Sequence, residues 1–244
     1  MTGTLTIAGL GPGNEALITP EVAAALAAAT DIVGYAPYVT RVPPRAGLTL
    51  HPSDNRVELQ RAADALRLAS EGGHVVVVSS GDPGVFAMAS AVFEALEDAP
   101  QWHDLPIRVL PGVTAMLAAA ASAGAPLGHD FCAINLSDNL KPWALIEKRL
   151  RLAAEADFAI AMYNPRSASR PDGFGRALEI LREAGCDERI MIFARSVSTP
   201  GQRIETVELR DARPEMADMR TLVIVGNSAT RRVGRWVYAP RWVR

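Results

Sequence analysis

VVVVSSGDPGVFAM, residues Val75–Met88, is the stretch of this chain that decides the fold. Its all-apolar run is typical of a strand buried on both faces, and it ends in the tight turn Ser79–Gly84 before a helical pattern begins. In open α/β sheets, the loops at the carboxyl ends of such strands bind small ligands. The turn is therefore the first candidate site.

Apolar runs and helical patterns alternate along the whole chain, which predicts βαβ units and an α/β fold. Strands are expected at residues 5–10, 31–35, 48–51, 75–79 and 107–110, and then at 131–136, 158–163, 190–194, 204–209 and 222–225. Helices are expected at residues 21–29, 57–70, 86–96, 114–123, 142–155 and 173–184. Thr19, which precedes Pro20, is expected to cap the first helix.

The sequence predicts two α/β domains, residues 1–115 and residues 116–244, with a cleft between them. The first domain should have a mostly parallel sheet. The second should have a mixed sheet, because only a short turn-rich segment precedes residues 204–209, which favours antiparallel pairing with the strand before it. The Arg-rich residues 231–244 are expected to be a docking segment or a frayed terminus.

The composition is that of a soluble globular protein, with 49% apolar residues, 21% charged residues and a net charge of −2. This charge gives no reason to expect a nucleic-acid partner, and no apolar run reaches the roughly 20 residues of a membrane span. The N-terminus leads into a strand without the leader of a signal peptide. A cytoplasmic protein with no membrane partner is therefore expected.

Cys132 and Cys186 are the only cysteines. They could form a disulfide, but two buried thiols suit a cytoplasmic protein better. Neither the cysteines nor the four histidines have the spacing of metal ligands, so no metal is expected.

The turn after the valine run presents one carboxylate, Asp82, and no Lys or Arg. An anion about 4 Å from this carboxylate would be repelled by roughly 4 kcal/mol at an effective dielectric constant near 20. A phosphate cradle is therefore disfavoured, because it needs backbone N–H groups and positive charge. A cationic or hydroxyl-rich ligand would fit, and S-adenosylmethionine (SAM) carries a sulfonium, an ammonium and a ribose.

A second glycine-rich segment, Gly9–Gly13, follows the first expected strand. A dinucleotide-dependent oxidoreductase would need a further glycine where this chain has Asn14, and Pro12 removes an N–H that a pyrophosphate would use. The glycines could also serve only a tight turn. A third strand end, Leu110–Ala115, places Thr114 where a hydroxyl commonly caps a helix.

Cationic side chains follow several of the expected strands in the second half of the chain. Arg166 and Arg195 lie at strand ends, and Lys141 lies in a comparable polar loop. Because guanidinium and ammonium groups recognise carboxylates, this placement indicates a carboxylate-bearing substrate.

Together these motifs resemble the tetrapyrrole (precorrin) methylase family over essentially the whole chain. The segments that carry the resemblance are Gly9–Gly13, Gly81–Pro83, Pro111–Thr114 and Leu222–Gly226, joined by Gly34–Val39, Gly128–Cys132, Leu136–Trp143 and Met162–Ser167. The resemblance implies a homodimer of two-domain subunits that bind SAM in the cleft between the domains.

The resemblance also assigns residues. The positions implied for SAM are Pro12, Ser80, Gly81, Asp82, Val85, Thr114, Ala115, Tyr163, Ser196, Thr221 and Leu222. The positions implied for the tetrapyrrole substrate are Tyr35, Tyr38, Arg166 and Arg195. The resemblance does not assign the groups that move protons in the implied reaction, and the candidates proposed for that role are Asp138, His129 and Lys141.

The implied activity is methyl transfer from SAM to C17 of a reduced tetrapyrrole, coupled to contraction of the macrocycle, in cobalamin biosynthesis. The acetate and propionate groups of such a substrate agree with the cationic strand ends. Several alternatives stay open: the cobalt-containing substrate of the anaerobic route, a methylase of RNA or protein with the same fold, an oxidoreductase, and a carrier that binds without catalysis.

Overall fold

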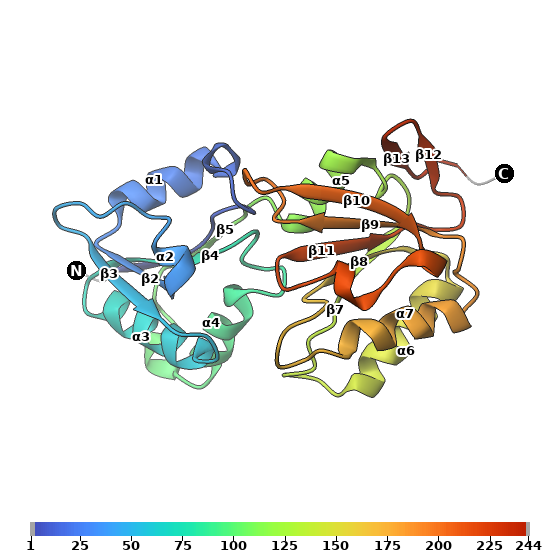
Figure 1. Cartoon of the computed structure of the whole chain (residues 1–244). Helices are drawn as coiled ribbons and strands as arrows, with labels where there is room; N and C mark the ends of the chain where they lie inside the picture. The colour runs from blue at the N-terminus through green and yellow to red at the C-terminus, as the bar shows by residue number, and fades with distance from the viewer. Residues whose placement is uncertain (1–2, 243–244) are drawn as a thin grey trace. The chain divides into compact units, whose positions relative to one another are not determined.

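Two α/β units make up the computed structural model, which describes residues 3–242 (Figure 1). The first unit extends to Thr114, and the second begins at Ala115. The predicted division after residue 115 lies one residue further along the chain.

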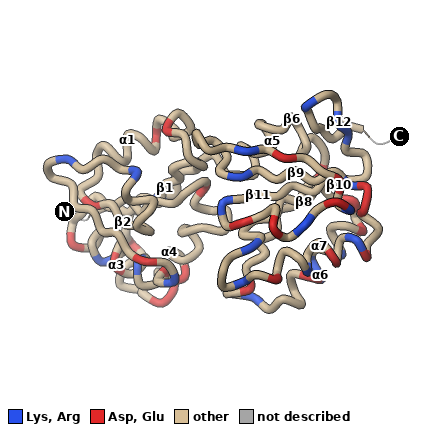
Figure 2. Tube along the Cα trace, viewed as in Figure 1, with Lys and Arg blue, Asp and Glu red and all other residues tan. Residues whose placement is uncertain are grey.

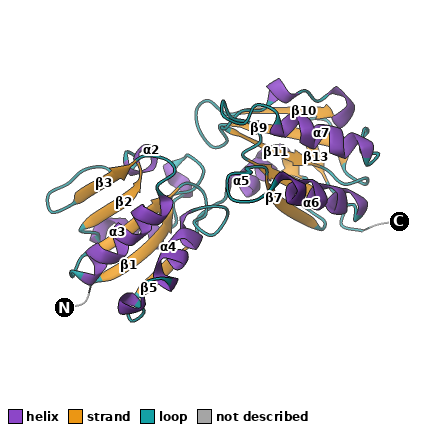
Figure 3. Ribbon diagram, turned by 90° about the horizontal axis from the view of Figure 1, so that it is seen from below, coloured by secondary structure: helices purple, strands orange, loops and turns teal. Residues whose placement is uncertain are grey.

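The first unit contains a five-stranded sheet in the order β3-β2-β4-β1-β5. Figure 3 shows this sheet with β1, β2, β3 and β5 labelled. Its strands are β1 (Thr4–Gly9), β2 (Asp31–Tyr35), β3 (Thr49–Ser53), β4 (His74–Ser79) and β5 (Ile107–Leu110). All neighbouring strands pair in parallel, so the prediction of a mostly parallel sheet is confirmed. All five carboxyl ends therefore lie at one edge of the sheet.

Helices cover both faces of this sheet. They are α1 (Pro20–Ala28), α2 (Ala36–Val39), α3 (Glu58–Ser70) and α4 (Met88–Glu97). Alternate residues of β4 face opposite ways: Val75 and Val77 pack in one core cluster with residues of α3 and α4, while Val76 and Val78 pack in a second with residues of α1. The Thr19 side chain accepts a hydrogen bond from the N–H of Val22, so the predicted cap of α1 is confirmed. The short helix α2 was not expected.

The second unit contains a mixed sheet in the order β10-β9-β11-β8-β7. Its strands are β7 (Phe131–Asn135), β8 (Ala159–Tyr163), β9 (Ile190–Arg195), β10 (Arg203–Glu208) and β11 (Thr221–Val225). β7 and β8 are parallel, whereas β10 pairs antiparallel with β9, as predicted.

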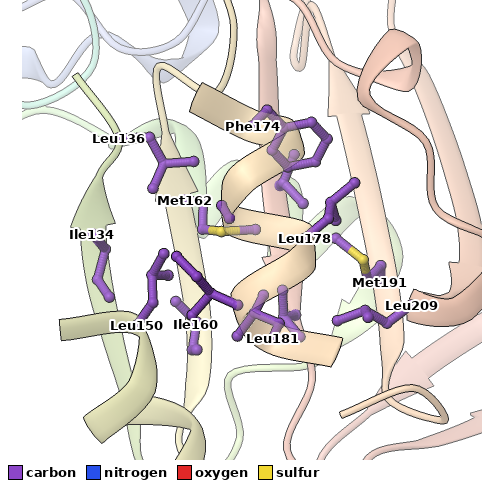
Figure 4. Packing of buried hydrophobic residues seen from close by; sticks show 14 of the residues in the cluster. Ile134, Leu136, Leu150, Ile160, Met162, Phe174, Leu178, Leu181, Met191 and Leu209 are labelled. Atoms are coloured by element: carbon purple, nitrogen blue, oxygen red, sulfur yellow. The ribbon is translucent and has the colours of Figure 1, made fainter. Parts of the chain in front are cut away.

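One face of this sheet packs on α6 (Trp143–Glu155) and α7 (Gly173–Glu183). Figure 4 shows the buried core between them, where Ile160 and Met162 of β8 meet Leu178 and Leu181 of α7. α5 (Ala115–Ala123) packs against β10 and β11. The alternation along β11 places Val223 in the core with α6 and α7.

A third, three-stranded sheet corrects the expectation of a frayed C-terminus. β12 (Arg231–Val233) and β13 (Trp236–Tyr238) form an antiparallel hairpin, and β13 pairs in parallel with β6 (Gly124–Ala125) in the segment expected to be only a turn-rich break. Val237 is buried, while the hairpin carries exposed arginines on β12 (Figure 2). Residues 243–244 of the Arg-rich segment lie outside the described residues.

Both cysteines are free thiols, which sets the disulfide aside. Cys186 is buried, but Cys132 is only half-buried, so the expectation of two buried thiols is wrong for Cys132. Burial raises the pKa of both thiols. Within residues 3–242, no helix is long and apolar enough to cross a membrane, and no group of three or more His, Cys, Asp or Glu side chains could hold a metal.

Candidate functional site

Three loops of the first unit meet at the carboxyl edge of its sheet, after β1, β4 and β5. Gly11 and Gly81 exchange two backbone hydrogen bonds, of 3.2 and 2.9 Å, and the N–H of Leu10 donates to the carbonyl of Ser79 at 2.8 Å. The loops that follow β1 and β4 are therefore hydrogen-bonded to each other through an antiparallel bridge, whereas the strands that precede them pair in parallel.

The glycines of these loops are required by the close approach of the three backbones. A Cβ atom on Gly9 would lie 2.7 Å from the nitrogen of Gly112, and one on Gly112 would lie 2.3 Å from the carbonyl oxygen of Gly81. Real Cβ atoms do not make contacts this short, so no larger residue fits without a backbone shift. Neither a tight turn nor a dinucleotide is needed to explain Gly9.

Asp82 fastens two of the loops together. Its Oδ1 accepts a hydrogen bond from the N–H of Gly84 at 2.8 Å, and its Oδ2 accepts one from the N–H of Gly112 at 3.1 Å. From the sequence, this carboxylate was interpreted as a charge that faces a ligand. In the structure, each of its oxygens already accepts a backbone N–H.

Arg41, which the sequence analysis did not single out, holds the loop after β1. Its guanidinium donates to the carbonyls of Leu10 at 2.5 Å, Gly11 at 3.0 Å and Gly13 at 3.3 Å. Burial lowers the pKa of Arg41, while Tyr38 and then Glu15 raise it. An arginine after a short helix carries no sequence signal for this role, because its acceptors are backbone carbonyls.

If the loop after β1 binds SAM, as the family resemblance implies, replacing Arg41 with methionine should weaken that binding about tenfold, because the loop loses charge-assisted hydrogen bonds of about 1.5–3 kcal/mol each. Isothermal titration of purified protein with SAM measures the affinity. Arg45→Met is the matched control, since Arg45 also donates to three carbonyls, those of Leu26, Ala27 and Ala29, but at the end of α1. Equal affinities of the two variants would remove the role proposed for Arg41.

The second unit gathers most of its expected site residues at one edge of its sheet. Asn135 pairs with Tyr163 at the carboxyl ends of β7 and β8, and Arg195 at the end of β9 pairs with Thr221 at the start of β11. The positions at or just beyond this edge are Asp138, Lys141, Tyr163, Arg166, Arg195, Ser196, Thr221 and Leu222. Sequence reasoning placed Tyr163, Arg166, Arg195 and Ser196 at strand ends, and the register brings those ends together.

Several of these side chains are already engaged. The Tyr163 hydroxyl accepts a hydrogen bond from the N–H of Met116 at 3.1 Å, and Nε of Arg166 donates to the carbonyl of Pro171 at 3.2 Å. Nε of Arg195 donates to Oδ2 of Asp218 at 2.9 Å, so Arg195 has a carboxylate partner within its own unit.

Asp218, a residue that sequence reasoning missed, organises this edge. Its Oδ1 accepts hydrogen bonds from the Thr221 hydroxyl at 2.8 Å and from the N–H of Arg220 at 2.9 Å. Burial raises the pKa of Asp218, but the hydrogen bonds from Thr221, Arg195 and Arg220 outweigh it and hold the pKa below the ordinary aspartate value.

Asp218→Asn should therefore reduce stability most at neutral pH. Because the folded-state pKa lies below the unfolded one, the wild-type carboxylate contributes stability above the unfolded pKa of about 3.9 and loses it as pH falls through the folded pKa. Urea unfolding at pH 7 and pH 3 should show a difference between wild type and variant that shrinks at pH 3. The exposed Asp211→Asn serves as the control. A difference that stayed constant with pH would contradict the prediction.

His129 does not join the other two candidates for proton transfer. It lies just before β7, whereas Asp138 and Lys141 follow the carboxyl end of that strand. A strand of five residues separates the two ends by about 16 Å. Asp138 is exposed, and burial followed by the charge of Arg149 lowers the pKa of the half-buried Lys141.

Non-glycine residues with positive φ follow strands at the site edge of each five-stranded sheet. Phe86 follows the turn after β4 with φ 53°, Asn164 follows β8 with φ 51°, and Ser196 follows β9 with φ 49°. Positive φ in a non-glycine residue costs on the order of 1–3 kcal/mol and is often found where a site requires a particular geometry.

Comparison with known proteins identifies the family. The family model for tetrapyrrole (corrin/porphyrin) methylases matches residues 4–213. The chain belongs to the tetrapyrrole methylase family. The resemblance inferred from the glycine loops is thus confirmed, and the oxidoreductase alternative is set aside.

Two relatives match this methylase over nearly their full length. It is 52% identical to precorrin-3B C(17)-methyltransferase of a Sinorhizobium species, with 99% of this chain and 98% of the relative covered. It is 40% identical to the probable cobalt-factor III C(17)-methyltransferase of Salmonella typhimurium, with 93% of each covered.

Solved structures agree with this placement. The crystal structure of the methyltransferase CobJ matches the methylase with a TM-score of 0.96 and 71% identity, covering 98% of this chain and 100% of that one. A uroporphyrin-III C-methyltransferase of Thermus thermophilus complexed with S-adenosyl homocysteine shares the fold, with a TM-score of 0.69, 23% identity and 92% of each chain covered.

Proposed function

We propose that this protein transfers a methyl group from SAM to C17 of precorrin-3B, with contraction of the ring to give precorrin-4, in cobalamin biosynthesis. The observation that carries the proposal is the 52% identity, over 99% of this chain, to a precorrin-3B C(17)-methyltransferase. The lower identity, 40%, to a probable cobalt-factor III enzyme makes the cobalt-containing substrate the second candidate.

SAM, when bound, supplies an electrophilic methyl group on its sulfonium. In the first unit, the residues proposed to hold it are Pro12, Ser80, Gly81, Asp82, Val85 and Thr114. In the second unit they are Ala115, Tyr163, Ser196, Thr221 and Leu222. The first set fits the group, because it offers backbone carbonyls, the hydroxyls of Ser80 and Thr114, the carboxylate of Asp82 and apolar side chains, with no lysine or arginine in the turn after β4.

The tetrapyrrole is proposed to contact Tyr35, Tyr38, Arg166 and Arg195. The Tyr35 and Tyr38 rings meet edge to face, with centroids 5.3 Å apart, at the carboxyl end of β2. Burial, and then the neighbouring Tyr35, raise the pKa of the Tyr38 hydroxyl, so this phenol stays a neutral hydrogen-bond donor. Arg195 would have to share its guanidinium between Asp218 and a substrate carboxylate.

The methyl step needs alignment more than an activated side chain, because the enamine-like carbon of a reduced tetrapyrrole is already nucleophilic. Alignment of the reacting atoms can supply about 7–11 kcal/mol. Ring contraction also needs protons moved, and Asp138 and Lys141 are proposed for that task. Burial, and then the charge of Arg149, lower the pKa of Lys141, which makes its ammonium a stronger proton donor than that of an ordinary lysine. His129, at the opposite end of β7, is not retained in this role.

Asp138→Asn should leave methyl transfer within about twofold of wild type and lower ring-contracted product at least about tenfold, since a positioned general acid or base contributes about 10²–10⁴-fold. Mass spectrometry counts the methyl groups, and NMR reports the contraction. Asp130→Asn, an exposed carboxylate before β7, is the control. Normal contraction in Asp138→Asn would leave Asp138 only a turn-forming role.

The test of the activity is anaerobic incubation of the protein with labelled SAM and precorrin-3B, followed by mass spectrometry. Gain of one methyl group with release of S-adenosylhomocysteine supports the proposal. Transfer only to cobalt-factor III would favour the second candidate. SAM binding without transfer to either would turn the search to RNA and protein acceptors, or to a carrier role.

A homodimer in the cytoplasm, with neither nucleic acid nor membrane as a partner, completes the proposed function. The family resemblance supports the dimer. The net charge of −2 supports the expectation that the protein does not bind nucleic acid. Light scattering after gel filtration should give about twice the chain mass of 26.0 kDa.

A further inference from the structure

A cavity of about 240 Å³ lies in the first unit between the edge strand β3 and helix α3. His51 and Ser53 of β3 line one side, and Gln60, Arg61 and Asp64 of α3 line the other. The family motifs do not include these residues, and none of them has been assigned a role above.

Arg61 is the unusual member of this lining, because its side chain is charged and only 4% of the residue is exposed. Nε donates to the Ser53 hydroxyl at 2.7 Å, Nη2 to the carbonyl of Asp54 at 2.6 Å, and Nη1 to the sulfur of Met88 at 3.3 Å. Every one of these acceptors is neutral. A guanidinium has five N–H donors, so these three hydrogen bonds leave some of the N–H groups of Arg61 available to a further acceptor.

No carboxylate forms an ion pair with Arg61 in the part of the chain that the structure describes. Burial lowers the pKa of Arg61, and the more distant charge of Glu58 and the phenols Tyr38 and Tyr35 only partly restore it. Buried charges are normally paired, because removing an ion from water is costly. The buried guanidinium of Arg61 therefore lacks the anionic partner that a buried cation normally has, among the residues that the structure describes.

The other charged groups of the cavity have partners of their own. His51 Nε2 lies 2.7 Å from Asp31 Oδ1, and Arg67 pairs with Glu71 at 2.8 Å. Asp64 accepts a hydrogen bond from the Gln60 amide at 3.3 Å. Arg61 is thus the cation of the cavity that an incoming anion would meet.

We propose that this cavity binds a carboxylate group through Arg61. The Ser53 hydroxyl positions the guanidinium, since it accepts from Nε of Arg61 and donates to the carbonyl of Gly34 at 3.2 Å. A volume of about 240 Å³ suits a short side chain such as acetate or propionate. Two sources offer that chemistry: a carboxylate side chain of the tetrapyrrole, which rests on the proposed function, or a free small carboxylate.

The first measurement is an NMR titration of the full chain with carboxyl-¹³C propionate, compared with the neutral isostere propionamide. Wild type should bind propionate in preference to propionamide, and Arg61→Met should lower the propionate affinity at least about tenfold, the loss expected for a charge-assisted pair. Arg67→Met, which removes a paired cation of the same cavity, should stay within about twofold of wild type.

Equal binding of propionate and propionamide, or full propionate binding by Arg61→Met, would show that the inference is wrong. If Arg61→Met does not fold, Arg61→Lys replaces it: the ammonium keeps the charge but lacks the paired donors, so affinity should fall about threefold to tenfold. An affinity equal to that of wild type would count against the inference.

Kinetics then distinguish the two sources. If the carboxylate belongs to the tetrapyrrole, Arg61→Met should raise the KM for precorrin-3B about tenfold, with kcat and SAM affinity within about twofold of wild type. An unchanged KM, with propionate binding lost, assigns the cavity to a free carboxylate. The titration needs no turnover, so failure of the proposed methylation would leave its result intact.

Discussion

Gly112→Ala should lower SAM affinity at least about 100-fold and destabilise the first unit by about 3 kcal/mol. The new Cβ would lie 2.3 Å from the carbonyl oxygen of Gly81 and 2.8 Å from that of Gly9. Both contacts are with backbone, so no flexible side chain can move aside. The loops would have to separate by about 1 Å, a displacement that by itself can cost about 100-fold in a positioned site.

Titration with SAM and urea unfolding measure the two effects of Gly112→Ala. Gly201→Ala is the matched control, because the nearest atom to its new Cβ is the Thr199 hydroxyl at 3.8 Å. That variant should keep its SAM affinity and lose less than about 1 kcal/mol. Normal SAM binding by Gly112→Ala would mean that the packed glycines do not form the cofactor site.

The central strands of the two five-stranded sheets, such as β4 and β11, could be predicted from the sequence because burial on both faces makes them continuous apolar runs. The observed β2 and β5 match their predicted ranges residue for residue. The third sheet was missed for a physical reason: β6 has two residues, and β12 and β13 have three each, too few to show a period. Its strands are recognisable only once Gly124 and Val237 are brought together by the fold.

The candidate site residues were predicted where a glycine or a hydroxyl follows a strand, and Arg41 and Asp218 were missed. Arg41 binds backbone carbonyls, which every residue carries, so no motif distinguishes it from a surface charge. Asp218 binds one backbone N–H and the side chains of Thr221 and Arg195, and its pairing with Arg195 depends on the fold. His129 shows the opposite difficulty, because nearness in sequence does not bring residues together. Its motif lies close in sequence to Asp138, but an intervening strand puts the two residues at opposite ends of the sheet.

Asp82→Ala should lower SAM affinity at least about tenfold and destabilise the protein by about 2 kcal/mol, because two backbone N–H groups lose their acceptor. The N–H of Gly84 is exposed and can turn to water, whereas that of Gly112 is partly buried and bears most of the cost. Asp82→Asn should have an intermediate effect, since an amide has one oxygen and would direct its NH2 group at the other N–H.

Stability and SAM affinity measured on the same variants decide what the carboxylate does. If Asp82 acts by joining the loops, both quantities should fall together in Asp82→Ala and, less, in Asp82→Asn. If it acts by attracting the charge of SAM, Asp82→Asn should lose affinity with stability unchanged, and added salt should weaken wild-type binding. Asp104→Ala, which removes an exposed carboxylate of the same unit, should change neither. Because both oxygens of Asp82 already accept backbone N–H groups, we expect the first outcome.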